Sequence, residues 1–167
     1  QDLNLGLILH YTFNGNVLDV GPNGLHGTLN NAVYTTDESG VPNEALYFNG
    51  TTSYVGIPDN PLAKPDFPFT IACMVKYDAP QTIEETQVFG LDFYQNNYFG
   101  AWTNLMFGRV EIAFGGGAGG MGASNRRTKR GTTTLNANQW YRITYIIRGA
   151  TDMDIYIDCV NDGGTYS

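Results

Sequence analysis

The chain has 167 residues, enough for one domain with a single hydrophobic core. Its formal net charge of −7 excludes general binding to nucleic-acid phosphates, and no apolar run reaches the about 20 residues of a membrane span. Glycine (21 residues) and aromatic residues (11 Tyr, 9 Phe and 2 Trp) are abundant, which favours strands joined by tight turns.

The first predicted element is a strand at residues 5–13, where the apolar run is dense enough to be covered on both faces over part of its length. A tightly wound loop rich in glycine follows at 19–27. Its backbone carbonyls, with Asp19 and Asn23, would give the oxygen-only environment that Ca²⁺ prefers. The alternative is that Asp19 and Asn23 cap turns through their side chains.

The stretch 45–59 predicts a β-hairpin. Alternating apolar runs at 46–48 and 54–57 flank Asn49-Gly50, and this dipeptide between such runs is a strong hairpin signal. Gly56 predicts either a bulge or a close backbone approach, and Pro58 ends the run because it cannot donate to a ladder. A short strand at 28–34 precedes the hairpin. The sequon at 49–51 coincides with a turn that the fold needs in any case.

Residues 67–77 predict a central strand with Phe69, Ile71, Cys73, Val75 and Tyr77 on one face. Further strands are expected at 87–94 and 98–103, about a polar turn, and at 104–114. Aromatic and amide side chains near this turn are candidate ligand-binding residues for a glycan, although they also suit a core or rim: Tyr94, Asn96, Asn97, Tyr98 and Trp102.

A glycine-rich basic excursion is expected at about 115–131. It lacks the Gly-Lys-Ser/Thr ending of a phosphate-binding loop. Its basic residues suit either a solvated loop tip or contact with an acidic partner surface: Arg126, Arg127, Lys129 and Arg130. Strands at 140–148 and 153–160 and a turn at 161–164 complete the chain. Cys73 and Cys159 leave open one bridge between strands or two separate thiols.

These segments, in this order, resemble the concanavalin A-like jelly roll in its laminin G-like branch. The resemblance rests on residues 6–15, 19–27, 48–58, 69–76, 138–143 and 155–158. It implies a single all-β domain over 1–167, an antiparallel two-sheet jelly-roll sandwich that is secreted or at the cell surface. It also implies binding of glycans or extracellular proteins, and a structural Ca²⁺ near Asp19.

Relatives usually continue past the equivalent of Ser167, so this chain is expected to lack its last strands. The strand at 5–13 would then be a long apolar edge, which isolated proteins avoid. Either a C-terminal segment is missing or a partner supplies it by strand addition. The chain begins at Gln1 without an initiator Met, which signal-peptide removal and trimming explain equally well.

Three functions follow as hypotheses. The first is a non-catalytic extracellular recognition or adhesion module, and fold alone does not fix its ligand. The second is a structural subunit of a surface assembly or filament, joined through the unpaired strand edge and the basic loop. The third is a glycoside hydrolase, for which alternation would place Asp152, Asp154 and Asp158 on one face. We expect a protein that is not an enzyme.

Overall fold

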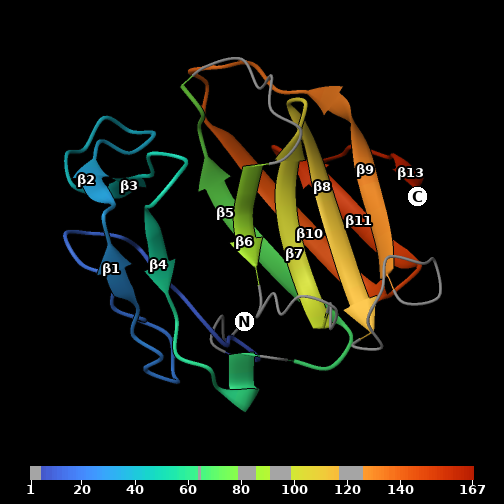
Figure 1. The fold of residues 1–167 in the computed structure, drawn as a ribbon, viewed down its shortest axis with the longest axis horizontal. Coiled ribbons are helices and arrows are strands. Elements are labelled where there is room, and N and C mark those ends of the chain that lie inside the picture. The colour runs from blue at the N-terminus through green and yellow to red at the C-terminus, as the bar shows by residue number, and fades with distance from the viewer. Residues whose placement is uncertain (1–4, 64, 79–85, 91–98, 117–125) are drawn as a thin grey trace. The chain divides into compact units, whose positions relative to one another are not determined.

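The computed structural model (Figure 1) describes residues 5–63, 65–78, 86–90, 99–116 and 126–167. Within these ranges the chain consists of antiparallel strands and turns, with a single 3-10 turn at Pro61–Ala63. The all-β prediction is confirmed. The chain forms two compact units, Gln1–Ala63 and Lys64–Ser167, and each is described by itself. The single-domain organisation stays a prediction.

The first unit contains two separate two-stranded sheets. In one, β1 (Thr28–Asn30) pairs with β4 (Tyr54–Gly56); in the other, β2 (Val33–Thr35) pairs with β3 (Ala45–Tyr47). The prediction that the runs flanking Asn49 pair with each other is therefore wrong. Gly56 lies in regular register opposite Thr28, so the predicted bulge is also absent from this pairing.

The side chain of Asn49 explains why β3 and β4 do not form a hairpin. Its Oδ1 accepts hydrogen bonds from the backbone N–H groups of Thr51 (3.0 Å), Thr52 (2.9 Å) and Ser53 (3.1 Å). The segment after β3 is thus a loop closed around one side chain, a local bonding pattern that competes with a strand ladder. After this loop the chain forms β4, which pairs with β1.

The predicted strand at residues 5–13 is wrong as well. The described part of this segment makes only an isolated bridge between Tyr11 and Asp19. Gly6 (φ +79°) and Phe13 (φ +56°) adopt left-handed backbone conformations that interrupt an extended strand. The long apolar edge that the self-association hypothesis required is therefore not formed by these residues.

The second unit consists of two antiparallel sheets. One has the order β12-β11-β10-β5 and the other the order β13-β9-β8-β7-β6. Their bounds are β5 Phe69–Val75, β6 Thr86–Gly90, β7 Phe99–Met106, β8 Arg109–Gly116, β9 Arg126–Thr134, β10 Tyr141–Gly149, β11 Asp152–Ile157, β12 Val160–Asn161 and β13 Thr165–Tyr166. Buried residues from both sheets form one core, so the unit is a two-layer sandwich.

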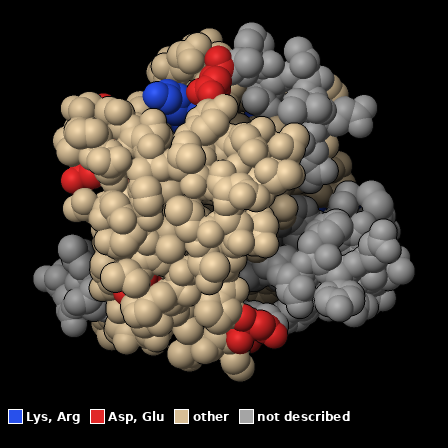
Figure 2. All heavy atoms as spheres, turned by 60° about the vertical axis from the view of Figure 1, so that its left-hand side comes forward, with Lys and Arg blue, Asp and Glu red and all other residues tan. Residues whose placement is uncertain are grey.

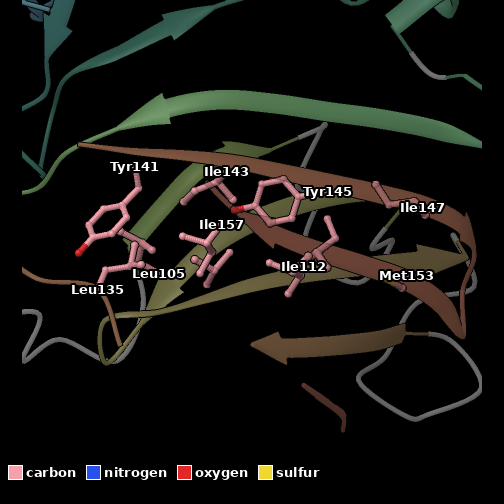
Figure 3. Packing of buried hydrophobic residues seen from close by; sticks show 11 residues of the cluster. Leu105, Ile112, Leu135, Tyr141, Ile143, Tyr145, Ile147, Met153 and Ile157 are labelled. Carbon is pink, nitrogen blue, oxygen red and sulfur yellow. The ribbon is translucent and has the colours of Figure 1, made fainter. Parts of the chain in front are cut away.

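Strict alternation along the strands builds this core (Figure 3). In β10, Ile143, Tyr145 and Ile147 are fully buried, whereas Arg142 and Arg148 are exposed. Each fully buried side chain of this kind contributes about 1.5–3 kcal/mol relative to an exposed one. The predicted apolar face of residues 69–77 is confirmed, because its members pack against the same cluster: Phe69, Ile71, Cys73, Val75 and Tyr77.

The two cysteines are not bridged. Cys73 is half-buried within β5, and Cys159 is exposed after β11. Burial raises the pKa of the Cys73 thiol to about 11, so this group is a neutral thiol at physiological pH.

Asp162 joins the two sheets of the second unit. It follows β12 of one sheet, and its carboxylate accepts the backbone N–H groups of Thr132 (3.0 Å) and Thr133 (3.1 Å) in β9 of the other. The Thr133 hydroxyl donates to the same carboxylate (2.5 Å), and the Thr132 hydroxyl donates to the Asp162 carbonyl (2.7 Å). These charge-assisted bonds hold the turn after β12 against β9.

The edge of β11 is closed in a similar way. The Lys129 ammonium in β9 donates to the Met153 carbonyl (2.6 Å), and the Met153 N–H donates to the Tyr166 hydroxyl (2.7 Å). Backbone groups that an edge strand would otherwise present for pairing are therefore satisfied within the chain.

Two neighbouring glycines in the turn after Asp162 give a matched test of this closure. A Cβ at Gly164 (φ +102°) would lie 2.1 Å from the Arg130 carbonyl oxygen, whereas one at Gly163 (φ +65°) would meet nothing within 4 Å. Gly163→Ala should cost about 1 kcal/mol for the left-handed backbone. Gly164→Ala should cost at least about 2 kcal/mol more, measured by urea denaturation, because backbone must also move. Equal losses would contradict the close packing of this turn on β9.

Candidate functional site

The carboxylate of Asp19 holds its loop together by accepting backbone hydrogen bonds. Its Oδ1 accepts hydrogen bonds from the backbone N–H groups of His10 and Gly21, both at 2.9 Å, and its Oδ2 accepts from Leu25 N–H at 3.0 Å. Burial alone would raise the pKa of this carboxyl. The three backbone donors and the nearby His26 outweigh burial and hold the pKa below its ordinary value. Asp19 therefore acts as an ionised turn organiser.

Asn23 is also engaged with backbone, since its Nδ2 donates to the Ile8 carbonyl at 2.9 Å. Both lone pairs of Asp19 Oδ1 are occupied by N–H donors, so Ca²⁺ would have to displace them. Within the described ranges, no group of three or more His, Cys, Asp or Glu residues is placed to hold a metal. The side chains present do not form a cage for Ca²⁺, whose binding stays a prediction.

Replacing Asp19 separates the two roles. We expect Asp19→Asn to lower the free energy of unfolding by about 2 kcal/mol, because the charge-assisted hydrogen bonds become weaker. The variant should have the same melting temperature in chelator and in excess Ca²⁺. Because the folded pKa is depressed, the carboxylate stabilises the fold above its ordinary pKa of 3.8, and this stability is lost as the pH falls below that value. The variant should therefore show a shallower acid limb in thermal melts. A Ca²⁺-dependent rise in the wild-type melting temperature, lost in the variant, would instead establish a metal site.

The basic cluster lies in strand β9 and not in a loop. Thus the prediction of a loop excursion up to residue 131 is wrong for 126–131, which lie in β9, where 126–130 pair with β8. Arg127 is half-buried and pairs with Phe114, and the side chain of Arg126 lies outside the described part of the structure. Lys129 and Arg130 are engaged within the chain, as described next.

A polar row crosses all strands of the five-stranded sheet. Successive register pairs join Gln87, Asn104, Glu111, Arg130 and Thr165 on β6, β7, β8, β9 and β13. Glu111 is 3% exposed, and its carboxylate pairs with the Arg130 guanidinium, which also contacts the Met106 sulfur. A buried charge of this kind needs its partner, because an unpaired one is strongly destabilising. The row therefore stabilises the sheet, and Arg130, whose side chain is 40% exposed, is paired with Glu111 within it.

Lys129 is used inside the unit as well. It is 8% exposed, and its ammonium lies 3.5 Å from an Asp154 carboxylate oxygen and 5.4 Å from the centroid of the Tyr166 ring. Local sequence pattern predicts only a surface role for these cations, because the pairing of strands that are distant in sequence is not visible in local composition. Partner binding through Arg126, Arg127, Lys129 and Arg130 stays a prediction.

The aspartates considered for hydrolysis are paired with cations. The Arg148 guanidinium lies 2.9 Å from an Asp152 oxygen and 2.5 Å from an Asp154 oxygen. The Arg148 hydrogen bond, with Lys129 nearby, holds the pKa of Asp154 below its ordinary value despite some burial. A general acid needs a raised pKa, so this carboxylate is unsuited to that role.

Asp158 does not share a face with them. It follows the end of β11 at φ +49°, and its carboxylate accepts the Arg142 N–H at 2.8 Å. The predicted alignment of three aspartates is therefore wrong for Asp158, because the strand ends at Ile157 and turns.

The ligand-binding residues predicted around the polar turn are Tyr94, Asn96, Asn97, Tyr98 and Trp102. The first four lie outside the described residues. Trp102 lies in β7, where its backbone pairs with Gly90 and Ala113, and its side chain is also outside the description. Glycan contact by these residues stays a prediction.

A hollow of about 240 Å³ opens beside the β7–β8 turn. Its lining comes from three segments of the second unit: Tyr77, Phe107, Gly108, Thr134, Leu135, Asn136 and Ala137. Backbone bonds fix the walls, since Leu135 N–H donates to the Gly108 carbonyl (2.9 Å) and Asn136 N–H donates to the Tyr141 hydroxyl (2.9 Å). In Figure 3, Leu135 lies beside Leu105 and Tyr141 at one end of the core. One wall of the hollow is therefore anchored in buried structure.

Phe107 is the unusual member of this lining. It is 52% exposed and occupies the first position of a two-residue hairpin turn, with φ +50°, followed by Gly108 at φ +74°. Both left-handed positions favour Asn or Gly, and a residue held in such a region costs on the order of 1–3 kcal/mol. Sequence reasoning missed this turn by extending one strand over 104–114; an isolated Gly108 in that run was the available signal.

Charge is sparse on the surface seen in space-filling view. On the face in Figure 2, Lys, Arg, Asp and Glu side chains occur as scattered groups among uncharged residues. The lining of the hollow contains no Asp, Glu, Lys, Arg or His. Tyr77, its one titratable residue, has a pKa raised mainly by burial, so its hydroxyl is neutral. The lining of this hollow is therefore uncharged.

One comparison with known proteins identifies the family. A family model described as the concanavalin A-like lectin/glucanases superfamily, Laminin_G_3, matches residues 49–166, well over half of the chain. No curated protein and no solved structure matches the chain significantly. No helix in the described residues is long and apolar enough to cross a membrane.

Proposed function

Because the chain belongs to the concanavalin A-like lectin/glucanases superfamily, in its Laminin_G_3 family, we propose that it is a non-catalytic recognition module that binds glycan outside the cell. The family supports a carbohydrate- or protein-binding role in general. The observation that carries our choice is the contrast between paired carboxylates and an open, uncharged hollow with an exposed aromatic wall.

The state of the carboxylates argues for binding over hydrolysis. Retaining hydrolysis needs two carboxyl groups about 5 Å apart, one able to donate a proton and the other free to attack. Asp152 and Asp154 instead share one guanidinium, and Glu111 is paired with Arg130. Each of these carboxylates lies against a cation, which suits a structural role.

The hollow has the features of a small binding site. Ligand sites combine apolar and aromatic walls with a few placed polar groups. Here Phe107 and Leu135 supply apolar surface, and the exposed side chains of Thr134 and Asn136 supply a hydroxyl and an amide. Such a site can orient a ligand without any charged residue.

Binding and hydrolysis are separated by one pair of assays. We expect the full chain to be retained by at least one insoluble or arrayed polysaccharide, with no release of reducing ends after long incubation. Asp154→Asn should keep this retention, because Asp154 lies in an ion pair and not in the hollow. Reducing-end release that Asp154→Asn abolishes would show that the protein is a hydrolase and would overturn the proposal.

A further inference from the structure

We propose that the hollow beside the β7–β8 turn binds one ring of a neutral saccharide, with Phe107 as its stacking platform. The inference rests on the proposed function and goes beyond it by naming the site and the ligand class. It is built from the volume of the hollow, its lack of charge and the exposed aromatic at its mouth.

The volume of the hollow limits the size of the ligand that it can hold. Drug-sized ligands occupy sites of about 300–1,000 Å³, and a stable protein–protein contact buries about 800 Å² on each partner. The hollow, at about 240 Å³, lies below the volume range of drug-sized ligand sites. It fits a single ring-sized unit, such as one residue of a longer chain that continues into solvent.

The residues that line the hollow are chemically suited to a saccharide ring. A saccharide has an apolar face of C–H groups and a rim of hydroxyl groups. An exposed aromatic ring such as Phe107 supplies apolar surface for the C–H face. Thr134 and Asn136, both exposed at the rim, can exchange hydrogen bonds with hydroxyl groups. The two kinds of wall therefore match the two kinds of surface on the ring.

The lack of cationic side chains in the lining of the hollow excludes acidic saccharides as ligands. A carboxylate or sulfate entering the hollow would lose hydration without meeting a cation, because the lining contains no Lys, Arg or His. The chain also carries a net charge of −7, which repels anions at longer range. The ligand is therefore neutral, and its affinity should change little between low and high salt.

The left-handed backbone conformation at Phe107 allows a direct test of this binding site. Asn is preferred at this left-handed position, so Phe107→Asn removes the aromatic ring while relieving the turn. This variant should melt no lower than the wild type, and loss of binding would then not reflect misfolding. Phe107→Tyr keeps the aromatic face and should keep binding. Val160→Ala is the control for loss of an exposed apolar side chain, because Val160 is 69% exposed in β12 of the other sheet.

Calorimetric titration of the full chain should use maltohexaose, cellohexaose, mannohexaose and xylohexaose as neutral probes, and polygalacturonate and heparin as acidic ones. We expect binding of at least one neutral probe, weakened about tenfold or more in Phe107→Asn and unchanged in Val160→Ala. Equal affinity in Phe107→Asn, or binding of acidic probes alone, would overturn this site while the recognition function stands. Binding of no glycan, here and on the polysaccharide array, would overturn both.

Discussion

The carboxylate of Asp162 is the interaction on which the second unit depends most. It joins the turn after β12 in one sheet to Thr132 and Thr133 in the other, and the residue is only 7% exposed. Lys129 and Tyr166 add bonds to Met153 at the edge of β11. Polar groups thus close the side of a sandwich whose apolar core alone would leave strand edges open.

The pairing of charged side chains within the fold determines which groups on the surface can contact a ligand. Cations and carboxylates that stand out in the sequence meet one another across strands, as Glu111 meets Arg130 and as Asp154 meets Arg148. Charges satisfied inside the fold are poorly placed for acid–base chemistry or for an acidic partner. The recess beside Phe107 is left uncharged, and the recognition that we propose there would depend on shape, stacking and hydroxyl contacts.

Local pattern predicted the sandwich strands and failed where side-chain hydrogen bonds to backbone, or contacts between distant residues, decide the outcome. Alternation identified the buried face of β5, because period 2 is a property of the strand itself. It also suggested a strand at 5–13 and a hairpin about Asn49, where side-chain bonds from Asp19 and Asn49 to backbone determine the fold instead. The hollow could not be predicted, because Tyr77, Phe107 and residues 134–137 are brought together only by sheet pairing.

The central claim is that a neutral saccharide ring occupies the hollow and contacts Phe107. The most direct measurement is a map of backbone amide chemical shifts during titration of the isotope-labelled full chain with the tightest neutral oligosaccharide. The account predicts that the largest shifts fall on residues 107–108 and 134–137, together with Tyr77. Shifts that leave these residues unchanged and gather elsewhere, around β9 or the Asp19 loop, would contradict it.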